Sequence, residues 1–228
     1  MENTTIALPK GRMLAGALEL LMRAGLDCSA VTEKSRSLVF YDKENGIRFL
    51  TVRPSDVPVY VEHGAADLGI TGKDVLLEGK KDVYELLDLG FGRCRFVLAA
   101  PQEKKERSFT EYISGLRVAT KFPRITEEYL KKKGIHGEVI RLNGAVELAP
   151  AVGLSEMIVD IVSTGRTLKE NNLQVVEDIL QSTARLIANR ASYRMKAGRM
   201  AKLVDAVEKA VAEGGYDSET VDSKRVYS

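Results

Sequence analysis

Apolar residues of this chain gather in short, β-branched runs that alternate with amphipathic stretches, a pattern typical of α/β proteins. Residues 4–8 predict a first strand, which an amphipathic helix follows until Gly25 ends it. Residues 37–42 and 47–53 alternate between apolar and polar positions around an Asn-Gly dipeptide, a strong hairpin signal. A further short strand is predicted at residues 66–72. The first part of the chain therefore predicts a sheet with helical connections.

The same pattern restarts near residue 94 and predicts a second β/α unit. Its elements are strands at residues 96–100, 116–119, 138–142 and 157–162, and helices at 124–133 and 146–152. The chain then closes with a strand-like stretch at 175–188 and a helix at 193–213 whose apolar face belongs to a core or a subunit contact.

This order predicts one domain inserted into another. We predict a discontinuous first domain formed by residues 1–91 plus 169–228. The second, inserted domain is predicted to comprise residues 92–168 and to carry the loop described next.

The run at residues 157–162 is short, β-branched and almost uninterrupted, as expected of a strand buried on both faces of a parallel sheet. It leads into Ser163-Thr164-Gly165-Arg166-Thr167, where Gly165 permits a tight turn with several backbone N–H groups aimed at one anion. The spacing of Thr167 and Glu170 fits a capping box and predicts a helix that starts at Thr167. The segment predicts a phosphate-binding loop, and the alternative is a well-capped turn without a ligand.

Asp160 lies where this loop begins, and an acid beside a phosphate repels it unless the acid engages hydroxyls or a metal ion. A ribose 5-phosphate supplies the hydroxyls. The segment resembles the phosphoribosyl-diphosphate loop of phosphoribosyltransferases, which has two acids before Thr-Gly-x-Thr. Val159 occupies the first acid position here, so the resemblance to that common form is partial.

Basic residues follow two predicted strands at their carboxyl ends, where ligands bind in open α/β sheets. Lys10, Gly11 and Arg12 follow the first strand, and Arg53 is at the end of the second strand of the hairpin. Such cations suit a diphosphate or a triphosphate, with lysine acting as a point charge and arginine as a fork. Ordinary surface charge on a strand–helix turn is the alternative.

Composition narrows the class of protein. The 228 residues carry 34 basic and 32 acidic side chains, so a nucleic-acid protein with a broad basic surface is not expected. Two cysteines and two histidines offer neither a disulfide framework nor a His-rich metal site. No apolar signal core or membrane-length run occurs, which predicts a cytoplasmic protein without membrane contact. The Gly-x-Gly-x-x-Gly and P-loop motifs are also missing.

A longer motif makes the resemblance specific. The chain resembles the ATP phosphoribosyltransferase family along the spaced run Glu147-x5-Gly153-x-Ser155-x2-Ile158-x-Asp160-Ile161-x2-Thr164-Gly165-x-Thr167-Leu168. The similarity extends to residues 8–12, 53–58, 64–70 and 119–123, and so covers most of residues 4–194. Because the chain stops where long members add a small regulatory domain, it resembles the short form.

The resemblance implies an α/β fold of two domains like type II periplasmic binding proteins, with mixed sheets and an active-site cleft between the domains. It implies that adenine N1 of ATP attacks C1 of 5-phosphoribosyl 1-diphosphate, giving phosphoribosyl-ATP and diphosphate, the first step of histidine biosynthesis. Mg2+ is the implied cofactor, held through substrate phosphates rather than by protein ligands. By the same resemblance Ser163, Thr164, Gly165, Arg166 and Thr167 hold the 5-phosphate, Glu147 and Asp160 face the ribose hydroxyls, and Lys10, Gly11, Arg12 and Arg53 bind nucleotide or diphosphate.

The residue inventory is consistent with this chemistry, because adenine N1 has a free lone pair and needs no general base. Catalysis then depends on orientation and electrostatics, to which Glu147, Asp160, Lys10 and Arg12 are expected to contribute. Short members of the family need a second subunit resembling histidyl-tRNA synthetase, which implies a hetero-oligomer. The alternatives are a phosphoribosyltransferase for a free nucleobase and a non-catalytic small-molecule binding protein of the same fold.

Overall fold

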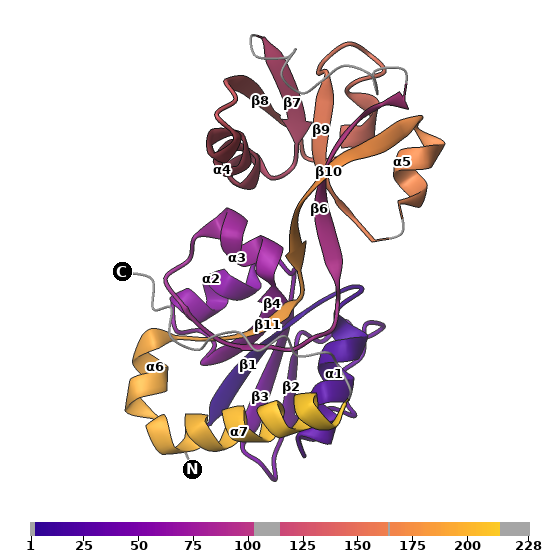
Figure 1. Ribbon diagram of the computed structural model, residues 1–228. Coiled ribbons are helices and arrows are strands. Elements are labelled where there is room, and N and C mark those ends of the chain that lie inside the picture. The colour runs from indigo at the N-terminus through magenta and orange to yellow at the C-terminus, as the bar shows by residue number, and fades with distance from the viewer. Residues whose placement is uncertain (1–2, 103–114, 164, 215–228) are drawn as a thin grey trace. The chain divides into compact units, whose positions relative to one another are not determined.

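The chain divides into two units, which are described separately (Figure 1). The computed structural model describes residues 3–102, 115–163 and 165–214. Unit 1 comprises Met1–Gly92 and Thr183–Ser228, and unit 2 comprises Arg93–Ser182. Each unit contains one mixed sheet with helices packed on it, which agrees with the predicted α/β class.

Unit 1 contains a six-stranded sheet in the order β2-β3-β1-β4-β11-β5. Two of its pairings, β3–β1 and β1–β4, are parallel, whereas β2, β11 and β5 run antiparallel to their neighbours. The strands are β1 (Thr4–Pro9), β2 (Val39–Asp42), β3 (Ile47–Val52), β4 (Leu68–Gly72), β5 (Tyr84–Asp88) and β11 (Ala184–Ala188).

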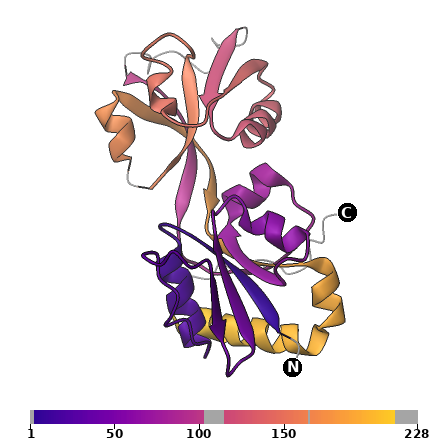
Figure 2. The same ribbon diagram turned by 180° about the vertical axis from the view of Figure 1, so that it is seen from behind.

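Helices cover both faces of this sheet. On one face α1 (Leu14–Arg23) and α7 (Ala197–Glu213) pack over Ile6 and Leu8 of β1. Figure 1 shows α7 crossing in front of the strands, and Figure 2, seen from behind, shows the strands in front of it. On the other face α2 (Val57–Glu62) packs over Ala7, the residue between them. This alternation follows from the period of two along a strand.

Two shorter helices complete unit 1. These are α3 (Lys73–Gly79), which directly follows β4, and α6 (Arg190–Met195), which directly precedes α7. A glycine allows α2 to lie close to the sheet, because a Cβ on Gly69 would come within 2.7 Å of the Val57 side chain. This close approach of the β4 backbone is therefore made to a helix of the same unit.

Unit 2 contains a five-stranded sheet in the order β10-β6-β9-β7-β8. The pairings of β9 with β7 and of β7 with β8 are parallel, and the other two are antiparallel. The strands are β6 (Cys94–Pro101), β7 (Leu116–Thr120), β8 (Gly137–Arg141), β9 (Met157–Val162) and β10 (Leu173–Ser182).

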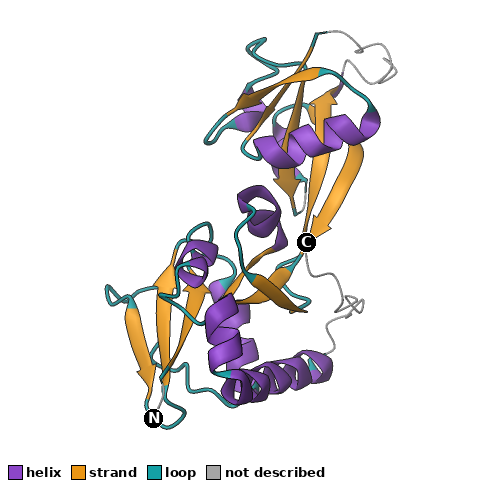
Figure 3. Cartoon of the chain, turned by 90° about the vertical axis from the view of Figure 1, so that its left-hand side faces the viewer, coloured by secondary structure: helices purple, strands orange, loops and turns teal. Residues whose placement is uncertain are grey.

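The helices of unit 2 also lie on both faces of its sheet. Val97 of β6 belongs to a core cluster on one face, and the 3-10 helix η3 (Val146–Leu148) and α5 (Arg166–Glu170) pack against this cluster. The next residue back along β6, Phe96, faces the other way and contacts the ring of Phe122 edge-on at 4.9 Å. Phe122 immediately precedes α4 (Pro123–Lys133), which lies across that second face (Figure 3).

The structure corrects the predicted return of the chain to unit 1. The sequence predicts this return at residue 169, but the structure places it at Thr183. The strand-like stretch 175–188 is in fact two strands, because β10 pairs antiparallel with β6 from Leu173 to Ser182 and only β11 joins the sheet of unit 1. A strand cannot change sheets without leaving its hydrogen-bonded neighbour, so the division falls between them.

Other element predictions also need correction. The helix predicted at 193–213 is interrupted at Lys196, which caps both α6 and α7 with non-helical φ and ψ of −108° and 32°. The predicted helix at 146–152 is the single 3-10 turn η3. The strand run at 157–162 does lie within a sheet, but that sheet is mixed because β6 runs antiparallel to β9.

The carboxylate of Asp88 binds both segments of the chain that connect unit 1 to unit 2. The side chain of Asp88 accepts hydrogen bonds from the backbone N–H of Gly90 (2.9 Å) and the hydroxyl of Thr183 (2.8 Å). These residues lie where the chain leaves unit 1 and where it returns. Arg185 pairs with Asp88 at 2.8 Å and with Glu85 at 3.2 Å. The partly buried Asp88 carboxylate thus binds residues near both points where the chain passes between the units.

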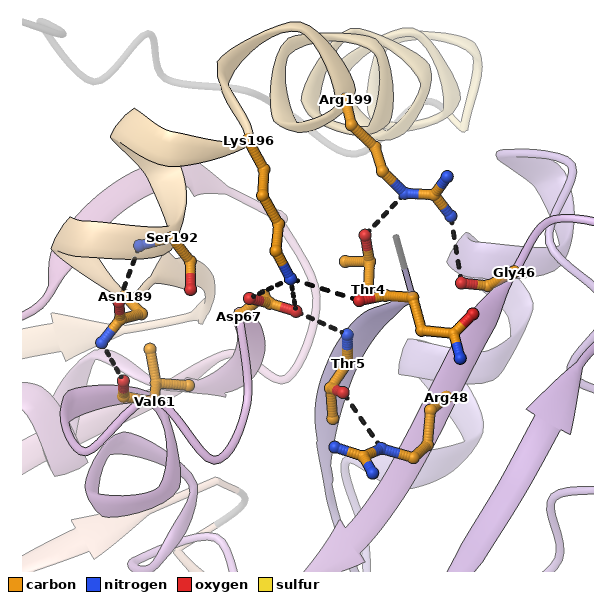
Figure 4. Close-up of polar contacts among 11 residues, drawn as sticks. Thr4, Thr5, Gly46, Arg48, Val61, Asp67, Asn189, Ser192, Lys196 and Arg199 are labelled. Atoms are coloured by element: carbon orange, nitrogen blue, oxygen red, sulfur yellow. Dashed lines mark hydrogen bonds and ion pairs between the residues drawn. The ribbon is translucent and has the colours of Figure 1, made fainter. Parts of the chain in front are cut away.

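The buried carboxylate of Asp67 attaches the C-terminal helices to the start of the sheet (Figure 4). Asp67 is only 6% exposed and accepts a hydrogen bond from the backbone N–H of Thr5 (2.8 Å). Lys196, between α6 and α7, donates to both its oxygens at 3.0 and 3.1 Å. Arg199 of α7 binds the hydroxyl of Thr4 and the carbonyl of Gly46. Polar contacts therefore fix α7 in addition to its apolar face.

Asp67 is stabilised as a carboxylate. Burial alone raises its pKa, but hydrogen bonds from Ser192, Thr5 and Lys196, with the charge of Lys196, outweigh burial and lower the pKa below the ordinary 3.8. The stabilisation is therefore complete above that ordinary value and is lost as the pH falls through the lower folded-state pKa.

Asp67→Asn should lower the free energy of unfolding at pH 7 by about 1–3 kcal/mol, because Lys196 and the Thr5 N–H lose a charged acceptor. The deficit should shrink at pH values below the ordinary aspartate pKa, where the parent carboxylate becomes protonated. Urea unfolding across this pH range measures both effects. Asp205→Asn on the exposed side of α7 is the matched control. Equal stability of Asp67→Asn and the parent at pH 7 would refute the anchoring role.

Candidate active site

The strand β9 positions the first acidic residue of the candidate site. It is the middle strand of its sheet and is hydrogen-bonded to β6 on one side and β7 on the other. Along β9, Ile158 and Val162 belong to the core cluster beneath η3 and α5, and Asp160 lies between them. The period of two places Asp160 on the same face. Its side chain oxygen accepts from the backbone N–H of Ile161 at 2.8 Å.

The helix η3 brings a second acid to this face. Val146 and Ala149 are buried in the same cluster as Ile158, so η3 packs against β9. Glu147 lies between these two buried residues and is partly exposed. Its negative charge contributes to the raised pKa of Asp160, so the two carboxylates lie within electrostatic range of each other. The structure therefore brings together the two acids that the sequence proposes for the ribose.

Asp160 has an unfavourable environment for its charge. Burial is the main cause that raises its pKa above the ordinary 3.8, and the negative charge of Glu147 raises it further. The hydrogen bond from the Ile161 N–H and the positive charge of Lys121 act in the opposite direction without cancelling the rise. A carboxylate with this balance gains from any ligand that offers it hydroxyl donors.

The predicted phosphate loop directly follows β9, but its helix starts differently from the prediction. Gly165 adopts the left-handed φ of 77° and is the N-cap, and α5 begins at Arg166. Thr167 is thus the second residue of the helix, and the predicted capping box is wrong. Glu170 instead accepts a hydrogen bond from Arg166 at 2.8 Å. The physical reason is the glycine, which turns the chain one step before the threonine can cap it.

The other loop residues lie at the same end of β9. Ser163 is exposed and follows the strand directly, whereas Thr164 lies outside the described residues. The Arg166 and Thr167 side chains are exposed, and Leu168 anchors α5 in the core cluster. The loop and the first turn of α5 therefore expose polar side chains to solvent, and the buried Leu168 attaches α5 to the core.

Unit 1 collects the predicted cations at one edge of its sheet. The parallel strands β1 and β3 end together, with Pro9 opposite Val52, and the Lys10 N–H donates to the Val52 carbonyl at 2.8 Å. Lys10 and Arg53 therefore follow neighbouring strand ends. Gly11 turns the chain with φ of 80°, and Arg12 is exposed just beyond it. The carboxyl ends of parallel strands are where ligands of open α/β sheets bind.

Lys121 belongs to the acidic site although the sequence assigns it no role. It directly follows β7, which runs parallel to β9 with Thr120 opposite Val159. Its charge is one of the two side-chain charges that act on Asp160. The available sequence signal is its place after a predicted strand, the same signal that singles out Lys10 and Arg53.

The described residues contain no group of three or more His, Cys, Asp or Glu side chains arranged to hold a metal ion. Across residues 3–102, 115–163 and 165–214, no helix has the length and apolar character needed to cross a membrane.

Comparison with known proteins identifies the family. The family model described as HisG: ATP phosphoribosyltransferase matches residues 53–209. The chain belongs to this family. An ATP phosphoribosyltransferase of Caldanaerobacter subterraneus subsp. tengcongensis is 53% identical over 94% of this chain and 100% of its own length. The corresponding protein of Moorella thermoacetica is 54% identical over 92% of this chain and 94% of its own.

Solved structures agree with the family and with the fold. The chain is similar to one in the ATP phosphoribosyl transferase (HisG:HisZ) complex from Thermotoga maritima, with a TM-score of 0.76 and 37% identity over 92% of this chain and 99% of that chain. A periplasmic sulfonate-binding protein of Methylobacillus flagellatus, 15% identical with a TM-score of 0.60, shares the fold alone. The predicted resemblance to periplasmic binding proteins is confirmed.

Asp160→Asn should not destabilise the chain at pH 7 and should raise its melting temperature. The raised folded-state pKa means that ionising Asp160 costs stability, and this cost grows as the pH rises from 3.8 through the folded-state pKa. Asparagine keeps an oxygen for the Ile161 N–H and carries no charge. In melts from pH 3 to pH 8, the melting temperature of this variant should exceed that of the parent by a margin that grows with pH. Asp205→Asn, at an exposed position of α7, is the control. A variant that melts well below the parent at pH 7 would contradict the environment described for Asp160.

Proposed function

We propose that this chain transfers the phosphoribosyl group of 5-phosphoribosyl 1-diphosphate to N1 of ATP. The products are phosphoribosyl-ATP and diphosphate, and the reaction is the first step of histidine biosynthesis. In a chain of this family, the observation that carries the proposal is the acid pair Asp160 and Glu147 on the face that η3 and α5 cover, next to the loop that follows β9.

Unit 2 supplies the residues proposed for the phosphoribosyl group. The loop formed by Ser163, Thr164, Gly165, Arg166 and Thr167 holds the 5-phosphate. Asp160 and Glu147 accept hydrogen bonds from the ribose hydroxyls. Hydroxyl donors relieve the mutual repulsion of the two acids, which is the main reason for assigning them to the sugar.

The same acids assist the chemistry. As the bond from C1 to diphosphate breaks, the ribose ring gains positive charge and becomes oxocarbenium-like. A nearby pair of carboxylates stabilises that charge more in the transition state than in the ground state. Adenine N1 attacks C1 through its own lone pair, so no side chain has to remove a proton. Orientation of the two substrates supplies the remaining rate acceleration.

Unit 1 supplies the residues proposed for the phosphates. Lys10, Arg12 and Arg53 neutralise the nucleotide or diphosphate at the carboxyl edge of β1 and β3, where Gly11 keeps the backbone free of a side chain. The departing diphosphate carries several negative charges. Basic side chains that are already in position when the reaction starts therefore lower the barrier to its departure.

Mg2+ is the proposed cofactor and enters on the substrate phosphates. The described residues offer no cluster of three protein ligands, and Mg2+ commonly keeps several waters and binds through substrate phosphates. When bound, it neutralises charge on the leaving diphosphate. The chain's own contribution is the cationic edge formed by Lys10, Arg12 and Arg53.

We also propose a second subunit as partner. The chain spans 99% of a chain solved in the HisG:HisZ complex from Thermotoga maritima. The resemblance to short family members implies a regulatory subunit similar to histidyl-tRNA synthetase. The partner-bound form is therefore expected to be the fully active one.

Thr167→Ala should weaken binding of phosphoribosyl diphosphate without harming the fold. The hydroxyl caps no helix, and alanine is the better helix former by at most about 0.7 kcal/mol, so the melting temperature should stay equal or rise slightly. Loss of a hydrogen bond to a phosphate costs about 1.5–3 kcal/mol, which is roughly ten- to a hundredfold in affinity. Calorimetric titration measures it, with exposed Thr32→Ala as control. Parental affinity in Thr167→Ala would remove this residue from the site.

Diphosphate release tests the function itself. The chain, alone and with the regulatory subunit, is incubated with phosphoribosyl diphosphate, Mg2+ and one candidate acceptor. Release is expected with ATP and not with adenine, guanine, uracil or orotate, and it should be much faster with the second subunit. Release with a free base would favour the nucleobase alternative, and no release with any acceptor would favour a binding protein. Full turnover by the isolated chain would contradict the need for the partner.

A further inference from the structure

The backbone around Lys121 is fixed at the acidic site. Thr120 is fully buried, and its hydroxyl donates to the Val159 carbonyl of β9 at 2.7 Å. The same hydroxyl accepts from the Phe122 N–H at 2.9 Å, and the Phe122 ring packs against Phe96. Both neighbours of Lys121 are therefore held, which leaves its exposed side chain one step beyond the residue that pairs with Val159.

Asp160 follows Val159, so the parallel register brings Lys121 and Asp160 to the same level of adjacent strands. The β6 residue opposite Asp160 is the apolar Val97, and α5 presents the apolar Leu168 to this face. Among the described side chains, the charges that act on Asp160 are Glu147 from η3 and Lys121 from the end of β7. Among the described residues, Lys121 is thus the cation whose charge acts on Asp160.

Two acids that share a partly buried face do not both ionise readily, because burial and mutual repulsion favour one shared proton. A protonated carboxyl offers the ribose hydroxyls one hydrogen-bond acceptor fewer. It also removes one of the two negative charges that stabilise the positive charge developing on the ribose ring. A cation held at the neighbouring strand end offsets the repulsion. The ordinary alternative is a solvated surface lysine with no effect on the site.

We propose that Lys121 is a positioning residue of the proposed phosphoribosyl transfer, and that its ammonium keeps Asp160 ionised beside Glu147 so that the pair can receive the ribose. This inference rests on the proposed function. It assigns Lys121 an action through Asp160 and no contact with the reacting atoms.

Lys121→Met tests this by pH profile, measured with the holo-complex, ATP and phosphoribosyl diphosphate. The acid limb of kcat/KM should move upward by about one pH unit, in line with the loss of one nearby opposite charge. At a pH below the acid limbs of both the parent and Lys121→Met, kcat/KM of the variant should be about tenfold lower than that of the parent. At pH 8, where Asp160 is ionised in every variant, kcat/KM should recover towards the parent value. Lys121→Arg should restore the parent profile. Lys132→Met, on the exposed side of α4 in the same unit, should leave it unchanged.

A direct titration separates this inference from the proposed function. The Asp160 carboxyl is followed by NMR in the substrate-free parent, Lys121→Met and Lys121→Gln, and its pKa should rise by about one unit in both neutral variants. An unchanged Asp160 titration, or a loss of kcat/KM equal at every pH, overturns the role of Lys121. A parent that releases no diphosphate with ATP overturns the proposed function instead, whatever the titration shows.

Discussion

The pairing of β9 on both of its edges is the constraint on which the candidate site depends. Hydrogen bonds to β6 and β7 fix the level of every β9 residue, and the Thr120 hydroxyl adds a bond to Val159. Asp160 can then lie only on the face that η3 and α5 cover, level with Lys121. A shift by one residue would turn Asp160 to the opposite face and remove it from Glu147.

Two aspartates show how this chain divides its charges between stability and function. Asp67 is buried and Asp160 is partly buried, and burial raises the pKa of each. Asp67 receives several hydrogen bonds and a lysine, so its pKa ends below the ordinary value. Asp160 receives one backbone bond and faces a second acid, so its pKa ends above it. The well-satisfied acid anchors a helix, and the poorly satisfied one is available to a ligand.

Local sequence patterns predicted most strands and the chemistry of the site. Strand β9 was predicted with its observed bounds because a short β-branched run between turn signals is decided by residues within it. The ends of α1 and α4 are also set locally, because Gly25 and Gly134 adopt left-handed backbone angles just after these helices. The site residues themselves, Asp160 and Glu147 among them, came from a spaced motif that no folding information was needed to recognise.

What the sequence by itself determined is therefore the local elements, the α/β class and the family. The tertiary structure decided which sheet each strand joins: β10 pairs with β6, so the chain returns at Thr183, although 175–188 looks continuous in the sequence. It also decided that α5 begins after Gly165 and that the charge of Lys121 acts on Asp160. Strand partners and charge neighbours are set by contacts between residues far apart in the chain, which local propensity and periodicity do not encode.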